Sequence, residues 1–174
     1  MTLGPLEWFT NPLGSLLAAI VAGLDPRELR TVALIDLGAP PAAETTERLI
    51  RSCRGVPLHL EGSLMMAVFA TPLEGVRCAL ELAELAEPGR GRVTGALHDG
   101  LMSDATSDDF VEAVSRTAAE LADLASPGQL LVTGAVRDGM PDDPRIDLSH
   151  LGTTRLLGQM MEVIEVRRVD EREA

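Results

Sequence analysis

The chain has 174 residues, of which 45% are hydrophobic and 24% are charged, and its formal net charge is −12. This length and composition fit one folded domain whose core needs no disulfide or structural metal. The negative charge excludes nonspecific nucleic-acid binding, because no basic stripe is available to displace counterions from phosphates. Aromatic residues make up only 2% and all 15 basic residues are arginines, so the predicted core is aliphatic and no lysine is available to a site.

Residues 1–30 are expected to form an N-terminal helical extension. Within them the apolar segment 12–24 (PLGSLLAAIVAGL) predicts a buried or interface helix. It is too short to span a bilayer and no basic cluster precedes it, which argues against a membrane span and a signal peptide; docking at a membrane surface is a minor alternative. Cys53 and Cys78 have no CxxC spacing and are interpreted as buried thiols of a cytoplasmic protein.

The apolar pattern after residue 30 predicts a strand, a helix, a hairpin of two strands, a second helix and a further strand. Their expected ranges are 31–37, 43–54, 56–60, 63–70, 72–87 and 91–98. The turn of the hairpin is placed at Glu61 and Gly62. The order is βαββαβ, which predicts an α+β domain with a ferredoxin-like palm core.

Additional elements follow this core. They are a helix over 108–125, a turn at 126–128, a strand over 129–133, a loop rich in Asp and Pro over 140–147, and a terminal hairpin from 153–158 and 161–168. The domain is therefore expected to cover residues 31–168, followed by a charged tail over 169–174.

Three stretches in this order resemble the catalytic domain of class III nucleotide cyclases, the adenylate and guanylate cyclases. They are HLEGSLMMAVFATPLEGVRCALEL, RTAAELADLASPGQLLVT and LSHLGTTRLLG with EVIEV. In this family two aspartates hold two divalent cations that bind the triphosphate and activate the ribose 3′-hydroxyl. The reaction is phosphoryl transfer, where positioning and charge neutralisation supply most of the rate.

The resemblance puts Asp36 at the first metal position and Ser63 at the second. Asp36 either keeps a role in metal binding or only caps the Gly-Pro turn that follows it. A neutral hydroxyl cannot replace a carboxylate for Mg²⁺, which prefers hard anionic oxygens. Rescue by Glu61 is a further alternative, although its position two residues upstream shifts its carboxylate by about 6–7 Å along the strand.

The base-reading positions of the family fall on His59 and on Asp109, or on Asp108 if the register slips by one. A His-Asp pair could still read a base edge. The other interpretation of His59 is a surface histidine on an edge strand.

The transition-state positions, an asparagine and an arginine in the family, fall on Arg116 and Glu120. A glutamate sets like charge against the developing negative charge, which implies a loss on the order of 10³-fold or more. The alternative for this pair is an ion pair four residues apart on one helix. The Leu-Lys-Gly that precedes the family's last strand is Leu156-Leu157-Gly158 here, without the lysine.

Three functions remain open at this stage. The first is a catalytically degenerate cyclase homology domain that serves as a regulatory or interaction module. The second is a divergent active cyclase, or one half of a heterodimer in which this chain supplies Asp36. The third is a sensor that binds a nucleotide or another small molecule without turnover.

All three functions imply a dimer, with itself or with another cyclase-like chain, because family sites are built across a two-fold interface. No cofactor is expected, apart from Mg²⁺ or Mn²⁺ if nucleotide binding persists.

Overall fold

The computed structural model describes residues 31–39, 42–85, 92–100 and 107–169, except for the side chains at 59, 61 and 107–112. In chain order its elements are β1 (Thr31–Asp36), α2 (Ala43–Ser52), β2 (Val56–Glu61), β3 (Leu64–Phe69), α3 (Pro72–Leu85), β4 (Thr94–Asp99), α4 (Ser107–Leu124), β5 (Leu130–Thr133), α5 (Gly134–Asp138), β6 (Ile146–Leu156) and β7 (Gln159–Arg168). The first six elements confirm the βαββαβ order and the α+β class.

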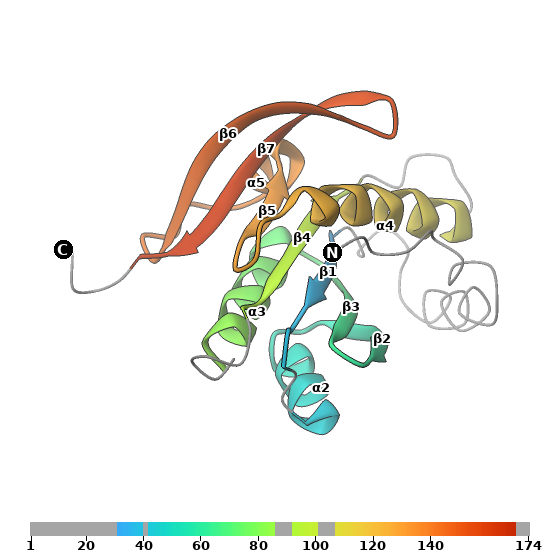
Figure 1. Cartoon of the computed structure of the whole chain (residues 1–174), viewed down its shortest axis with the longest axis vertical. Coiled ribbons are helices and arrows are strands. Elements are labelled where there is room, and N and C mark those ends of the chain that lie inside the picture. The colour runs from blue at the N-terminus through green and yellow to red at the C-terminus, as the bar shows by residue number, and fades with distance from the viewer. Residues whose placement is uncertain (1–30, 40–41, 86–91, 101–106, 170–174) are drawn as a thin grey trace.

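The strands form one seven-stranded sheet in the order β2-β3-β1-β4-β5-β7-β6 (Figure 1). The central strand β1 is antiparallel to β3 and to β4, and β5 then joins β4 in parallel. The long hairpin of β6 and β7 extends the sheet beyond this core, with β7 antiparallel to β5. The ends of β1 and of the β2–β3 hairpin therefore lie side by side, which is what positions the candidate site.

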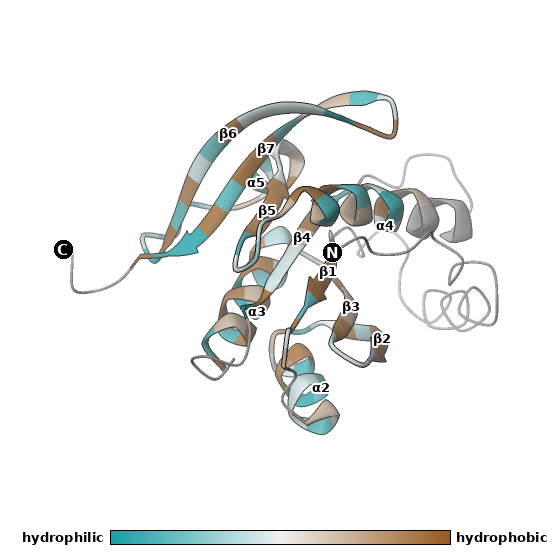
Figure 2. Ribbon diagram, viewed as in Figure 1, coloured by the Kyte–Doolittle hydropathy of each residue, from teal (hydrophilic) through white to brown (hydrophobic). Residues whose placement is uncertain are grey.

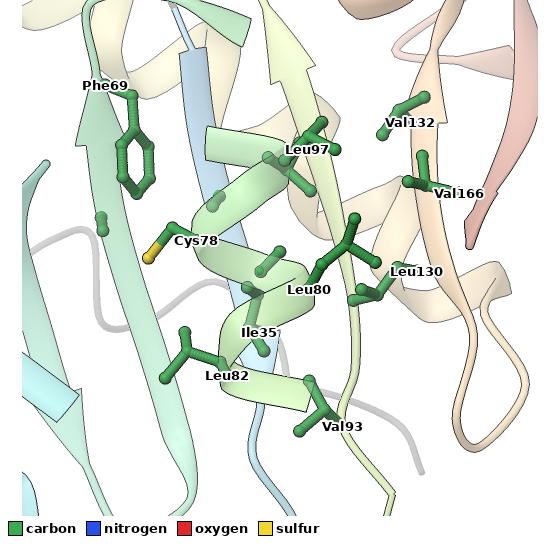
Figure 3. Packing of buried hydrophobic residues seen from close by; sticks show 14 of the residues in the cluster. Ile35, Phe69, Cys78, Leu80, Leu82, Val93, Leu97, Leu130, Val132 and Val166 are labelled. Carbon is green, nitrogen blue, oxygen red and sulfur yellow. The ribbon is translucent and has the colours of Figure 1, made fainter. Parts of the chain in front are cut away.

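Helices cover both faces of the sheet because successive strand residues point to opposite sides. On one face, Ile35 and its neighbours pack against α2, α3 and α5; Figure 3 shows this cluster around α3. On the other face, Leu34 and Val32 pack against the apolar side of α4. Phe69 is the one aromatic side chain among the buried residues of the described chain, so the core is aliphatic as expected.

Some boundaries differ from the sequence prediction. The predicted loop over 140–147 ends earlier than expected, because β6 already begins at Ile146. The five-residue helix α5 had not been predicted, β4 begins at Thr94 rather than 91, and Glu61 belongs to β2 rather than to the turn. Figure 2 shows why β6 was difficult to recognise: apolar and polar residues are mixed along this edge strand, which has neither a continuous apolar run nor a sustained alternation.

The predicted N-terminal helix over 12–24 lies outside the described residues, as do residues 170–174. The described chain ends at Val169, whose backbone N–H donates a hydrogen bond to the carbonyl oxygen of Arg145 at 2.9 Å. Within the described ranges, no helix combines the length and the apolar character needed to cross a membrane.

Candidate functional site

Asp36 is the last residue of β1, at the end of the strand where the sheet is bordered by the β2–β3 turn. Its side chain is partly buried, and its Oδ1 accepts a hydrogen bond from the backbone N–H of Gly38 at 2.9 Å. This contact is the turn-capping role that the sequence left open. It occupies one of the two acceptor oxygens of the carboxylate.

Ser63 lies beside Asp36, as the alignment with the cyclase positions requires. Gly62 and Ser63 form the two-residue turn between β2 and β3, and the positive φ of 59° at Gly62 is typical of the first position of a type II′ turn. The carbonyl oxygen of Ser63 accepts a hydrogen bond from the backbone N–H of Leu37 at 2.8 Å. The two positions that the family uses for metal binding are thus neighbours across adjacent strands.

The residues at this edge do not fit a two-cation centre. Of the two positions that the family uses for metal binding, only Asp36 supplies a carboxylate here, because Ser63 supplies a neutral hydroxyl. No group of three or more His, Cys, Asp or Glu side chains suited to a metal occurs in the part of the chain that the structure describes. Glu61 ends β2 opposite Leu64, but its side chain is outside the description.

The two predicted base-reading residues are placed only by their backbone. His59 lies in the edge strand β2 opposite Met66, next to an irregularity in the strand pairing at Pro57. Asp109 and Asp108 lie in the first turn of α4. The side chains of all three are outside the description, so base reading by His59 and Asp109 stays a prediction.

The two transition-state positions lie on α4, one helical turn apart. Arg116 is exposed, and the predicted ion pair between it and Glu120 stays a prediction. Glu120 has a different contact: its Oε2 accepts a hydrogen bond from the backbone N–H of Leu157 at 2.7 Å. Leu157 and Gly158 are the turn residues between β6 and β7, with φ values of 45° and 81°, the pattern of a type I′ turn.

A cavity of about 220 Å³ opens beside Asp36, between the end of β1 and the C-terminal end of α4. Its wall contains the ionisable side chains of Asp36, Arg92 and Asp123 together with apolar groups such as Leu34 and Leu64. This volume is below the roughly 300–1,000 Å³ of sites that enclose drug-sized ligands. Within one chain the cavity therefore suits a small molecule and not a nucleoside triphosphate.

The turn after α4 is held against the same cavity by backbone contacts. Thr94 Oγ1 accepts a hydrogen bond from the backbone N–H of Gly128 at 2.8 Å, and Gln129 Oε1 accepts one from the N–H of Ser126 at 3.0 Å. The Ser126-Pro127-Gly128 turn, of which Pro127 lines the cavity, is held by these two contacts from side chains to the backbone.

His98 is a partly buried ionisable group that sequence reasoning missed. It lies on β4, and its Nδ1 is 2.9 Å from the hydroxyl oxygen of Thr133 at the end of β5. Burial lowers the pKa of His98 to about 4, so its imidazole is neutral near pH 7. The sequence offered one signal for it: His98 ends the predicted strand over 91–98, and a strand residue points to one face of its sheet.

No protein-family model and no curated protein matches the sequence. Solved structures do match it. The guanylate cyclase domain of RhGC from Catenaria anguillulae, in complex with GTP, is 12% identical with a TM-score of 0.58, over 83% of this chain and 98% of that chain. An adenylate cyclase structure from Trypanosoma brucei is 16% identical with a TM-score of 0.61, over 85% of this chain and 92% of that chain.

A third structure is the adenylate/guanylate cyclase/hydrolase from Silicibacter pomeroyi. It is 21% identical to this chain with a TM-score of 0.55, over 83% of this chain and 99% of that chain. These likenesses confirm that the chain has the fold of the class III cyclase catalytic domains, as the resemblance implied.

Proposed function

We propose that this chain is a catalytically degenerate cyclase homology domain that acts as a dimeric regulatory or interaction module in signalling. The observation that carries the proposal is the contact between Glu120 and Leu157. At the position where the family has an arginine for the transition state, this chain has Glu120, whose carboxylate accepts a hydrogen bond from the backbone N–H of Leu157 at 2.7 Å. A negative charge there opposes phosphoryl transfer, in which charge develops on the transferred oxygens.

The edge of the sheet that carries Asp36 and Ser63, here called the metal edge after its role in the family, supports the same proposal. Asp36 supplies one carboxylate, of which one oxygen already accepts a hydrogen bond from the Gly38 backbone. Ser63 stands where a second carboxylate is needed, and a hydroxyl holds Mg²⁺ poorly. A single partly engaged carboxylate gives too little negative charge to hold two divalent cations against a triphosphate.

A dimer is the assembly that we propose for this module. The guanylyl cyclase domain from Blastocladiella emersonii, which shares this fold, is described as dimeric. In this chain, exposed apolar side chains gather on the β6–β7 hairpin, where Leu151, Leu157 and Met160 are 51%, 43% and 62% exposed. Burial of such groups favours association. Light scattering at micromolar concentration tests this assembly, and a monomer there would contradict it.

The decisive experiment is calorimetric titration with ATP and with GTP in the presence of Mn²⁺, combined with an assay for cyclic nucleotide. We expect no cyclic product above the background of a buffer blank. The guanylate cyclase domain from Catenaria anguillulae, assayed in parallel, controls for the conditions. Turnover by the purified chain would overturn the proposal, whereas absence of both binding and turnover supports an interaction role.

The cavity beside Asp36 favours one second candidate, a sensor of a small molecule. Its two carboxylates, one guanidinium and apolar wall suit a compact ligand that carries a positive charge next to an apolar group. A thermal-shift screen of small amines and amino acids tests this candidate. A ligand of this cavity should lose its effect in Leu64→Trp, which fills the space, and keep it in Leu151→Trp, because Leu151 is exposed and does not line the cavity.

A further inference from the structure

The two cysteines of the chain meet between α2 and α3. Cys53 follows the last residue of α2 as its C-terminal cap and is partly buried, and Cys78 lies in α3 and is fully buried. The two helices pack against each other on the same face of the sheet. Cys53 Sγ is 3.9 Å from Oε2 of Glu81, which lies about one turn beyond Cys78 on α3, so the Cys53 side chain lies against the part of α3 that carries Cys78.

Cys53 is reachable from solvent. It lines a cavity of about 450 Å³ between α2 and α3, whose wall also includes Ser52, Thr71 and Glu81. In Figure 3, Cys78 points away from Leu80 and Leu97, toward the side of α3 on which Phe69 lies. One thiol of the pair is thus accessible and the other lies buried behind it, which is the arrangement of an attacking and a resolving cysteine.

We propose that Cys53 and Cys78 are an oxidation-sensitive pair, which a low-molecular-weight disulfide entering this cavity converts into an intramolecular disulfide. The Cys53 thiolate attacks one sulfur of the incoming disulfide, forms a mixed disulfide and releases one thiol. The Cys78 thiolate then attacks the Cys53 sulfur and releases the second thiol. Two protein thiols are oxidised, the small disulfide is reduced to two thiols, and the protons of the cysteines end on those thiols.

Burial and local charge make the reaction of this pair with a disulfide slow. Burial and the carboxylate of Glu81 raise the pKa of the Cys53 thiol, and burial raises the pKa of Cys78 well above its usual value. The other ionisable groups that face the cavity are Arg54, Glu74 and Arg77. Because only the thiolate attacks, the dithiol persists under reducing conditions and the reaction accelerates as pH rises toward 9.

The cross-link would have a structural consequence for the candidate site. It would join the end of α2 to α3 and enclose the β2–β3 hairpin, whose turn carries Ser63. Closing such a loop restricts the unfolded chain, which we expect to raise the Tm by roughly 6–12 °C. The proximity of the two cysteines follows from the packing of α2 against α3, so this proposal does not depend on the proposed signalling role.

Oxidised glutathione is the probe for the test. The reduced full-length protein is incubated with it at pH 7, 8 and 9, and products are read by intact mass and by peptide mapping without reductant. We expect loss of two hydrogens per chain, a linked Cys53–Cys78 peptide and a rate that increases with pH. The Cys78→Ala variant should stop at the glutathione adduct on Cys53, and Cys53→Ala should not react.

The Glu81→Gln variant separates this chemistry from mere packing. Removal of the carboxylate charge beside Cys53 should accelerate oxidation roughly 2- to 3-fold, a change that a purely structural role would not produce. Circular dichroism verifies that each variant is folded. A persistent glutathione adduct on the wild type, a cross-link between chains only, or no reaction at pH 9 while the urea-unfolded protein reacts would each overturn the proposal.

Discussion

Glu120 on α4 accepts a hydrogen bond from the backbone N–H of Leu157, which lies 37 residues further along the chain. Leu157 is the first of two turn residues, so the ladder that closes at Leu156 and Gln159 provides no partner for its N–H. The carboxylate provides this partner, and Leu156 is buried in the apolar cluster beneath α4. One contact therefore anchors the tip of the β6–β7 hairpin to the helix that carries the transition-state positions of the family.

Replacement of this acceptor should weaken the fold. We expect Glu120→Ala to lower the free energy of unfolding by about 0.5–1 kcal/mol, because the Leu157 N–H loses its charged partner at an exposed position where water can replace it. Glu120→Gln keeps an acceptor oxygen and should cost less than half of this. Urea unfolding monitored by circular dichroism measures both. The exposed Asp123 on the same helix provides the control, and an equal loss in Asp123→Ala would show that the effect is not specific.

The turn itself is strained, and this strain can be relieved. Leu157 has a φ of 45°, a conformation that costs a leucine roughly 1 kcal/mol and suits asparagine far better. We expect Leu157→Asn to stabilise the protein by about 0.5–1 kcal/mol, since the leucine side chain is 43% exposed and gives up little burial. Leu157→Val, which is branched at Cβ, should destabilise the protein in the same urea experiment. The reverse order would contradict a type I′ turn.

The sequence predicted the parts of the fold that depend on local pattern. Continuous apolar runs such as 31–37 identified the buried strands, whereas the register of β3 against β1, which brings Ser63 next to Asp36, comes from the structure. The short helix α5 has too few residues for a helical period to be recognised, and the edge strand β6 lacks an apolar run.

The contact between Glu120 and Leu157 could not be predicted, because it depends on tertiary structure. It forms only when β7 pairs with β5, so that the β6–β7 hairpin folds back over α4. The same holds for the pair Cys53 and Cys78, which the sequence suggested only as two separate buried thiols. Pattern identifies elements, whereas contacts between distant elements follow from the order of strands in the sheet.

A second carboxylate at the metal edge should create cation binding without activity. We expect Ser63→Asp to bind Mn²⁺ more tightly than the wild type by at least 10-fold, since a second carboxylate then lies just before the strand that pairs with Asp36. Without metal, repulsion from Asp36 should lower the stability by a few tenths of a kcal/mol. Calorimetry with Mn²⁺ measures the affinity. Ser63→Asn is the neutral control, and equal binding by both variants would show that the carboxylate introduced at position 63 does not hold the cation.

Asp143 should make the fold sensitive to acid below pH 4. Hydrogen bonds from Arg145 and Arg77 hold the pKa of Asp143 well below its ordinary value of 3.8, and its side chain is only 5% exposed. A lowered folded-state pKa gives stability that is complete above the unfolded-state value and is lost as the pH falls below it. We expect Asp143→Asn to be destabilised at pH 6 but to lose less further stability between pH 4 and pH 3.

The measurement for Asp143 is urea unfolding at pH 6, 4 and 3. The control is Asp142→Asn, next to it in the same loop and exposed, which should reproduce the wild-type decline. A wild-type decline that persists unchanged in Asp143→Asn would assign the acid sensitivity to other carboxylates.

His98 should produce a separate pH effect at higher pH. Its folded-state pKa is about 4 because of burial, against an ordinary value of 6.5. Between these values the unfolded chain binds more protons than the folded one, so stability rises with pH across this window and is lost as the pH falls from about 6.5 toward 4.

We expect the wild type to lose up to about 3 kcal/mol of stability across this window through His98. His98→Asn, whose amide takes the place of the ring Nδ1 that lies near the hydroxyl of Thr133, should show a flatter profile, whereas the exposed His150→Asn should keep the wild-type slope. Urea unfolding at pH 7.5 and pH 5 measures the difference, and parallel profiles for wild type and His98→Asn would mean that folding does not lower the pKa of His98.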